Sequence, residues 1–323
     1  SCNAAISACE KGARWPSALL LLGSMPRWCP VPDVVSCSAA MSACEKAGEW
    51  LMALATAASM PALRIAADVV SCSAATSACE KGGQWHLAIE LLRSMPGHRV
   101  APNVVSCNAA ISACEKCLRW EEAALTLREA RSCNLRVDRI TYHATMSACE
   151  KCGRWRQALA AMRHMQWRGL RAAIVTYGVA ISAGEKAGLW ATTLGLLIDS
   201  ERRGLAGDIV PCNAATSACE AAKKWECALG LLLDTRRRLL EVTSVSCNAA
   251  ISACQKGARW WAALGLIRRL GAGGLRQEVI GCNAALLSCF GTRWWQWSLA
   301  LLSDMARSAL EPDSNSLAMA ATE

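Results

Sequence analysis

Cysteine and histidine are the side chains in this sequence whose types could support covalent or metal chemistry. The 323 residues include 20 cysteines and 4 histidines. Most cysteines occur in pairs seven residues apart, as in Cys37 and Cys44. On a helix that gap is about 10 Å, which is too long for a disulfide or a shared metal ion. The pattern indicates free thiols used as small buried apolar side chains, in a reducing compartment.

Motifs for metal binding or catalysis are missing from the sequence. The Cys-x-x-Cys pairs Cys114/Cys117 and Cys149/Cys152 have no second pair at zinc spacing. The histidines are scattered without partners for acid–base work: His86, His98, His143 and His164. There is no His-x-Glu with a downstream Pro-Cys-x-x-Cys, and no Gly-x-x-x-x-Gly-Lys-Ser/Thr loop. We therefore expect no enzyme activity, no bound metal and no cofactor.

The cysteines and tryptophans recur every 35 residues. The first cysteine of each pair stands at Cys2, Cys37, Cys72, Cys107, Cys212, Cys247 and Cys282, with Tyr142 and Tyr177 in the two remaining places. The tryptophans are Trp15, Trp50, Trp85, Trp120, Trp155, Trp190, Trp225, Trp260 and Trp295. A fixed period of this length is typical of a solenoid, in which each unit buries its apolar face against its neighbours.

Each unit is predicted to be a pair of antiparallel helices. In the unit 34–68, apolar residues from Cys37 to Cys44 have helical spacing, Gly48 ends this first helix, and a second helix runs from Trp50 to near Pro61. Glycines are expected to end other first helices in the same way: Gly12, Gly82, Gly153, Gly188 and Gly257. We expect each tryptophan to fill the wedge between one helix pair and the next.

The predicted fold class is all-α: a right-handed α-solenoid superhelix of about nine helix-turn-helix repeats plus a terminal half-repeat. The whole chain, 1–323, is predicted to be one array. Its units are 1–33 (partial), 34–68, 69–103, 104–138, 139–173, 174–208, 209–243, 244–278, 279–313 and 314–323 (partial).

The units resemble the pentatricopeptide repeat, whose 35-residue unit begins Val-Thr-Tyr-Asn. Ile140-Thr141-Tyr142 and Thr176-Tyr177 match its start, Glu45-Lys46-Ala47-Gly48 its middle, Ala18-Leu19 its second helix and Pro32-Asp33 its close. The resemblance extends over the whole chain. One departure is that cysteine replaces most of the family's tyrosines, and we expect the added tryptophan to return the lost aromatic volume.

The resemblance implies binding of single-stranded RNA, one nucleotide per repeat. Bases would be read by the fifth and thirty-fifth residues of each unit, whose short polar groups suit a base edge. These pairs are Asn3/Asp33, Ser38/Asp68, Ser73/Asn103, Asn108/Asp138, His143/Ala173, Gly178/Asp208, Asn213/Thr243, Asn248/Glu278 and Asn283/Asp313. The implied site is U-G-A-U-x-x-Y-Y-U. The alternative is that these are polar residues that merely favour helix starts.

Two further positions would support such binding. The second residue of each framed unit would sandwich a base, with core packing as the alternative: Val35, Val70, Val105, Ile140, Val175, Val210, Val245 and Ile280. Lysines after the second cysteine would contact phosphate, with a solvated charged face as the alternative: Lys11, Lys46, Lys81, Lys116, Lys151, Lys186 and Lys256. If these lysines touch RNA, binding should weaken steeply with salt, by about one unit of slope per lysine.

Charge and hydropathy limit the remaining function classes only loosely. The formal charge of +9 is compatible with a polyanionic partner. No apolar run reaches the roughly 20 residues that span a bilayer, and we expect no membrane partner and no small-molecule substrate. The resemblance implies a chloroplast or mitochondrion, with RNA processing, stabilisation, splicing or translation as the role and processing or editing proteins as further partners. The rival hypothesis is a protein–protein scaffold that uses the concave groove of the solenoid.

Overall fold

The computed structural model describes residues 2–25, 31–133, 135–205, 209–237 and 243–272, together with residues 282, 283, 285, 286, 303 and 305. This part of the chain contains sixteen α-helices and no strand, so the predicted all-α solenoid is confirmed. By its internal contacts the chain divides into two compact units, Ser1–Ala172 and Ala173–Glu323.

The helices alternate between the two kinds predicted for each repeat. In Ser1–Ala172 the first helices are α1 (Cys2–Lys11), α3 (Val34–Ala47), α5 (Val69–Lys81), α7 (Val104–Lys116) and α9 (Arg139–Lys151). The second helices there are α2 (Trp15–Ser24), α4 (Trp50–Ser59), α6 (Trp85–Ser94), α8 (Trp120–Ser132) and α10 (Trp155–Trp167). In Ala173–Glu323 the first helices are α11 (Ile174–Lys186), α13 (Ile209–Ala221) and α15 (Ser244–Lys256), and the second helices are α12 (Trp190–Arg202), α14 (Trp225–Arg237) and α16 (Trp260–Ala272).

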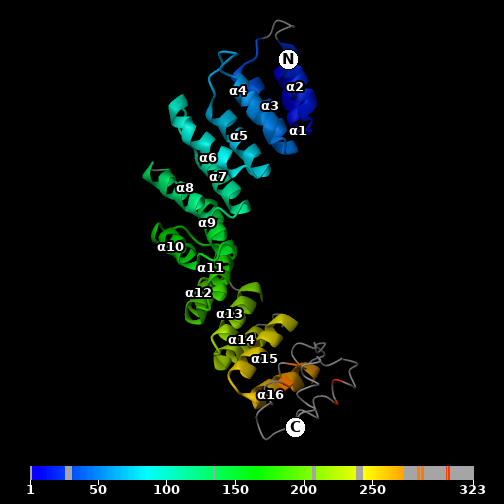
Figure 1. Ribbon diagram of the computed structural model, residues 1–323, viewed down its shortest axis with the longest axis vertical. Coiled ribbons are helices and arrows are strands. Elements are labelled where there is room, and N and C mark those ends of the chain that lie inside the picture. Colours follow the sequence, from blue (N-terminus) through cyan, green and yellow to red (C-terminus); the bar gives the residue numbers. More distant parts are fainter. Residues whose placement is uncertain are drawn as a thin grey trace. The chain divides into compact units, whose positions relative to one another are not determined.

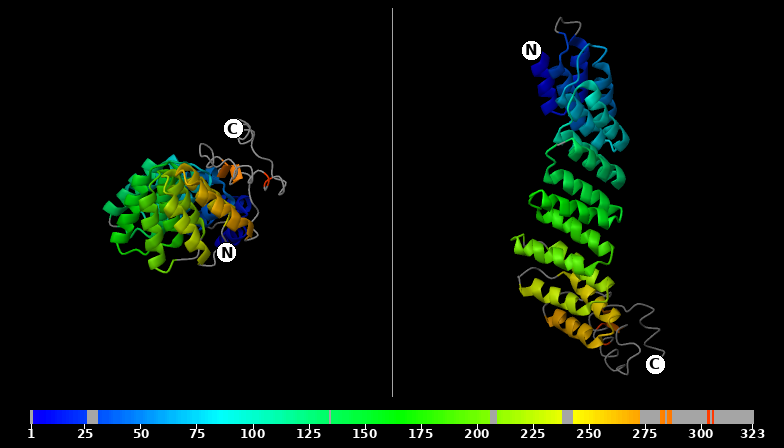
Figure 2. Two further views of the ribbon diagram at one scale, coloured as in Figure 1. Left: turned by 90° about the horizontal axis from the view of Figure 1, so that it is seen from below. Right: turned by 90° about the vertical axis from the view of Figure 1, so that its left-hand side faces the viewer.

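Within each of the two compact units, Ser1–Ala172 and Ala173–Glu323, the helices form two layers. Each first helix packs on its own second helix and on the first helix of the next repeat, so that α3, α5 and α7 lie side by side (Figure 1). The second helix also contacts the next first helix, as α4 contacts α5. The same pairing recurs along each unit when it is seen from other directions (Figure 2).

Small side chains allow the first helices to approach closely. Ala40, Ala110 and Ala250 are fully buried between neighbouring helices, and so are the thiols of Cys44 and Cys114. Burial raises the pKa of the Cys114 thiol to about 12. A thiol that stays protonated at neutral pH is a poor nucleophile and metal ligand. These cysteines therefore pack as small apolar residues.

The turn between the two helices of a repeat contains one residue in the left-handed region. Glycine supplies it in four repeats, as at Gly48 with φ +80° and Gly153 with φ +69°. Non-glycine residues hold the same backbone in the other four described turns: Ala13, Leu118, Lys223 and Ala258, with φ between 51° and 58°. The left-handed backbone of these four residues was not predicted from the sequence, because a non-glycine residue in this region leaves no local signal.

Three of the described recurrent tryptophans, Trp50, Trp85 and Trp120, each contact the following repeat, as expected. Trp50 packs so closely on Gly82 of the next repeat that a Cβ there would lie 2.2 Å from the indole ring. The Arg119 guanidinium carbon lies 4.4 Å from the centroid of the Trp85 ring, and that of Arg154 lies 4.9 Å from that of Trp120. The rings of Trp85 and Trp120 thus join their own second helices to the helix–helix turn of the next repeat. The arginine above each ring is placed for cation–π attraction.

Candidate nucleic-acid interface

A row of exposed aliphatic side chains follows the starts of the first helices. Each residue is the second in its helix, and each is 58–61% exposed: Val35, Val70, Val105 and Ile140 in Ser1–Ala172, and Val175, Val210 and Val245 in Ala173–Glu323. Core packing, the alternative open from the sequence, is excluded for these seven. Single exposed apolar residues are common, but an exposed apolar group at the same place in seven framed repeats is a candidate interaction surface. Ile280 lies outside the described residues.

Polar pairs link the fifth and thirty-fifth residues of four repeats. Asn3 Nδ2 donates to Asp33 Oδ2 at 2.9 Å, and Asn108 Nδ2 donates to Asp138 Oδ1 at 3.3 Å. Ser73 Oγ lies 3.4 Å from Asn103 Oδ1. In Ala173–Glu323, Asn213 Nδ2 donates to Thr243 Oγ1 at 3.2 Å. The structure therefore brings residues 30 apart in sequence together in pairs.

The thirty-fifth residue also caps the helix that follows it. Asp33, Asp68 and Asn103 each accept a hydrogen bond from the backbone N–H three residues later and form capping boxes with Ser36, Ser71 and Ser106. Asp138 and Thr243 are N-caps as well, of α9 and α15. Such a cap is worth about 1 kcal/mol. The helix-start interpretation is therefore correct for this position, although the same side chains also contact the fifth residue in four repeats.

Asp33 divides its two oxygens between these tasks. Oδ1 accepts from the Ser36 N–H at 2.7 Å and Oδ2 accepts from Asn3. The backbone N–H of Ser36 is the main cause that lowers the pKa of Asp33, against opposing burial. At Asp138 burial works to raise the pKa, but hydrogen bonds from Thr141 and Asn108 outweigh it and the net shift is downward. Both groups are held as carboxylates that accept hydrogen bonds.

Three predicted residues present polar atoms that no group among the described residues satisfies. The Oδ1 atoms of Asn213 and Asn283 and the Nε2 atom of His143 are buried and have no hydrogen-bond partner. A buried unsatisfied polar atom costs about 1–3 kcal/mol. A ligand that offers complementary donors or acceptors would remove that cost.

The remaining predicted reading residues differ from this pattern. Ser38 Oγ donates to the Val35 carbonyl at 3.0 Å. Ala173 is the N-cap residue of α11 and has no capping side chain. Gly178 faces open space, because an added Cβ would meet no atom within 4 Å. Asn248 lies near the start of α15. Asp208, Glu278 and Asp313 lie outside the described residues, as does the expected half-repeat 314–323.

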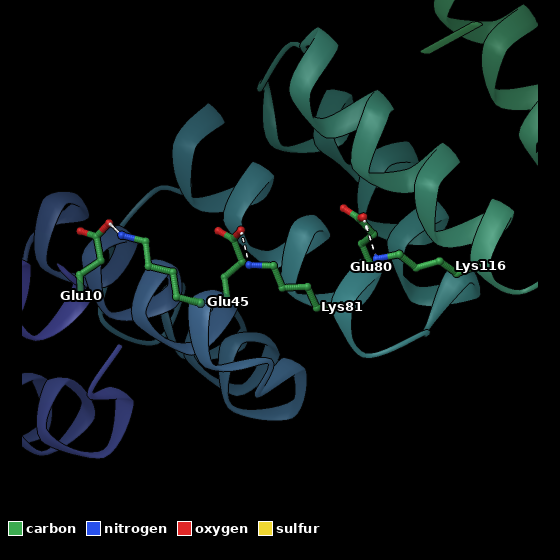
Figure 3. A network of polar contacts seen from close by, with 6 residues as sticks. Glu10, Glu45, Glu80, Lys81 and Lys116 are labelled. Atoms are coloured by element: carbon green, nitrogen blue, oxygen red, sulfur yellow. Dashed lines mark hydrogen bonds and ion pairs between the residues drawn. The ribbon is translucent and has the colours of Figure 1, made fainter. Parts of the chain in front are cut away.

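The predicted phosphate lysines form ion pairs across the repeats. Lys46 Nζ lies 2.9 Å from Glu10 Oε1, and Lys81 lies 3.1 Å from Glu45. The other pairs are Lys116–Glu80 at 3.0 Å, Lys151–Glu115 at 2.8 Å and Lys256–Glu220 at 2.8 Å. Figure 3 shows the first three pairs on consecutive repeats. We call these five pairs the charge ladder. Lys11 is exposed, and Lys186 ends α11.

Sequence reasoning missed which glutamate each ladder lysine pairs with, and it missed the role of Thr141. The glutamates pair with lysines 36 residues away, although the recurrent Glu-Lys dipeptide was a visible signal. Thr141 Oγ1 donates to Asn108 Oδ1 in a short contact and so fixes the amide of a predicted reading residue. The Asp-x-x-Ser sequence of the capping boxes was also visible.

No helix in the described part of the chain is long and apolar enough to cross a membrane. Across these residues no group of three or more His, Cys, Asp or Glu side chains is arranged to hold a metal ion.

Comparisons with solved structures agree with the fold. The crystal structure of the pentatricopeptide repeat protein PPR10 from maize matches with a TM-score of 0.65 and 22% identity, over 99% of this chain and 46% of that one. PPR10 in complex with an 18-nt psaJ RNA element matches with a TM-score of 0.49 and 19% identity, over 99% of this chain and 50% of that one. The pentatricopeptide repeat domain of Arabidopsis thaliana protein-only RNase P 1, in complex with tRNA, covers 53% of this chain and 90% of its own, with a TM-score of 0.48 and 11% identity. The chain thus spans about half the length of PPR10.

Sequence comparisons identify the repeat type. A search of curated proteins gives no match. The profile of the pentatricopeptide repeat domain matches residues 58–116, and that of the PPR repeat matches residues 105–135 and 140–170. The helix pairs of the matched segments recur with the same 35-residue spacing through both units. Residues 58–135 and 140–170 of the chain are pentatricopeptide repeats.

Proposed function

We propose that this chain binds a specific single-stranded RNA segment, one nucleotide per repeat, along the row of polar pairs and exposed aliphatic residues. The observation that carries the proposal is the row itself: an exposed Val or Ile stands at the second place of the seven framed repeats from 34–68 to 244–278, and a polar side chain stands at the fifth place in all of them except at Gly178. Adjacent helix axes are typically 8–10 Å apart, and a flat base in van der Waals contact on both faces needs about 7 Å between the flanking atoms. A base can therefore lie between the aliphatic groups of successive repeats.

The polar pairs would then choose the base. In the family, Asn with Asp resembles a uridine reader, Ser with Asp a guanosine reader and Ser with Asn an adenosine reader. Applied from the amino to the carboxyl end along RNA from 5′ to 3′, this gives U-G-A-U-x-x-Y-Y-U. The hydrogen bonds within these pairs support this use, because Asp33 and Asp138 orient the amides of Asn3 and Asn108. The unsatisfied oxygen of Asn213 suits a donor on a pyrimidine edge.

The biological role we propose is occupancy of an organelle transcript. Family resemblance favours a chloroplast or mitochondrion, and a bound solenoid can mask RNA from nucleases, remodel its structure, or guide processing, splicing or translation. Processing or editing proteins would be further partners. The proposal assigns no catalytic step to this chain.

A selection from random RNA tests the proposal. We expect enrichment of U-G-A-U followed at a two-base interval by pyrimidines. Changing Ser73→Asn together with Asn103→Asp should shift the third base from A to U, and an unchanged third base would defeat the reading scheme. Absence of RNA binding at low salt would instead favour a protein scaffold that uses the same exposed valines.

A further inference from the structure

We call the row of polar pairs and exposed aliphatic residues the reading row. The charge ladder lies on the same face of the first helices as this row. At 100° per residue, Val35, Ser38 and Lys46 fall within one stripe of α3, and Lys46 lies about 12 Å along the axis from Ser38. The same offsets apply in each first helix because the spacing is invariant. RNA that follows the row therefore passes the ladder.

The glutamate is the fixed half of each ladder pair. The glutamate side chains are 19–25% exposed, whereas their lysine partners are 41–52% exposed. Ser147 Oγ donates to Glu115 Oε1 at 2.7 Å, and Ser252 Oγ donates to Glu220 Oε1 at 2.6 Å. A lysine could swing away, but its glutamate would stay on the face.

The pairing changes what a lysine can contribute to binding. A free lysine that neutralises a phosphate releases a counterion into solution, and this release drives sequence-independent binding. A ladder lysine that moves to a phosphate leaves a bare carboxylate behind, which attracts a cation back. The net release is then close to zero, although the phosphate contact is made.

We propose that the ladder glutamates cancel the phosphate-driven part of RNA binding, so that affinity rests on the reading row. This inference rests on the proposed function and adds to it the residues that keep sequence-independent affinity low. The wild-type protein should accordingly bind RNA with a salt dependence much shallower than its lysines alone would give.

Neutralising the glutamates tests the inference in the full chain. The variant Glu45→Gln, Glu80→Gln, Glu115→Gln frees three lysines and keeps the volume of each side chain. Binding of the selected RNA and of oligoadenosine of equal length is measured by fluorescence anisotropy from 50 to 300 mM NaCl. Each freed lysine should steepen the log–log slope by about 0.7, hence by about two units for the three. Both RNAs should bind about tenfold or more tightly at the lowest salt.

A matched variant separates the ladder from net charge. Glu49, Glu90 and Glu121 are exposed, and the described residues give them no ion-pair partner. The triple change of these residues to Gln adds the same charge away from the ladder and should steepen the slope by less than half a unit. Helical circular dichroism verifies that both variants are folded, and the single change Glu80→Gln, expected to add about 0.7 to the slope, replaces the triple variant if it unfolds.

The outcomes separate this inference from the proposed function. If the wild-type protein binds the selected RNA and both triple variants match it in slope, the ladder has no such role and the proposed function stands. Equal steepening in both variants also overturns the ladder, because net charge alone would then explain it. If neither wild type nor variant binds any RNA, both proposals fail together.

Discussion

At the residue scale, Asp138 joins helix capping to the base reading that we propose. Its Oδ1 accepts from the Thr141 N–H at 3.0 Å and lies 2.8 Å from the Thr141 hydroxyl oxygen. The same carboxylate accepts from Asn108 Nδ2. Under the proposed function, a substitution of Asp138 changes both the free energy of unfolding and the affinity for RNA. Two different substitutions at this position are needed to separate these effects.

Asp138→Ala should lower the free energy of unfolding by about 1 kcal/mol, whereas Asp138→Asn should lose less because an amide oxygen still caps. The comparison is made by urea denaturation at pH 7. The Asp138 pKa lies below its ordinary value of 3.8. Its charged-state contribution is therefore complete above the unfolded-state pKa and disappears as the pH falls through the folded-state pKa. The stability gap between wild type and Asp138→Asn should close below about pH 4. A gap that widens in acid would contradict the assignment.

Gly178 offers a reading position that the chain leaves empty. Gly178→Asn should create a preference for uridine at the sixth base of about tenfold, because the side chain enters open space beside the row. Stability should rise slightly, since glycine is a poor residue inside a helix. Binding to four RNAs that differ only at the sixth base measures the preference. Gly195→Asn is the control, because Gly195 is equally open but lies on the second helix α12. An equal response in both variants would refute the reading role.

At the element scale, the turn between the helices holds strain that can be removed. Leu118 has φ 58° and is 55% exposed, so its side chain contributes little packing in return. Leu118→Gly removes about 1–2 kcal/mol of backbone strain and adds about 0.5–1 kcal/mol of unfolded-state entropy. The net gain should be about 0.5–1 kcal/mol in urea denaturation. The reciprocal control Gly153→Leu should lose a comparable amount, and stabilisation by Gly153→Leu would exclude this explanation.

The tryptophan at the start of each second helix should hold neighbouring repeats together. Trp120→Ala removes a ring that joins α8 to the following turn through Arg154, and should lower the melting temperature by several degrees. Trp167 is 79% exposed, so Trp167→Ala should leave the melting temperature within about 1 °C. Thermal circular dichroism compares the two. Equal effects would mean that the repeated tryptophan has no special role.

The sequence predicted the elements well because each helix repeats its own signals. Apolar spacing predicted a first helix that includes Cys37 to Cys44, and the tryptophan predicted a second helix from Trp50; the structure has α3 from Val34 and α4 from Trp50. Contacts between repeats were harder to predict. The Lys81–Glu45 pair joins residues 36 apart, and no local pattern says which acidic group a lysine will reach. The exposure of Val35 was equally undecided, because a valine at a helix start can face either way.

At the scale of the whole molecule, each repeat acts chiefly through its neighbours. Within each compact unit a first helix contacts the next first helix, and each described polar pair joins the first helix of a repeat to the last residue of the same repeat. Stability and binding in such arrays are close to sums of local and nearest-neighbour terms. A reading residue should therefore influence its own nucleotide with little effect on nucleotides several repeats away.

This locality predicts additive binding energies. Ser73→Asn with Asn103→Asp, in Ser1–Ala172, and Asn213→Ser, in Ala173–Glu323, share no hydrogen-bond partner. Their effects on the free energy of binding the selected RNA should add within about 0.5 kcal/mol. Asn108→Ala and Thr141→Val form the contrasting cycle, because these side chains bond directly, and their effects should depart from additivity by more than that. Isothermal titration calorimetry on each single and combined variant measures both cycles. Strong coupling in the first cycle would mean that the array binds RNA as one cooperative body and not repeat by repeat.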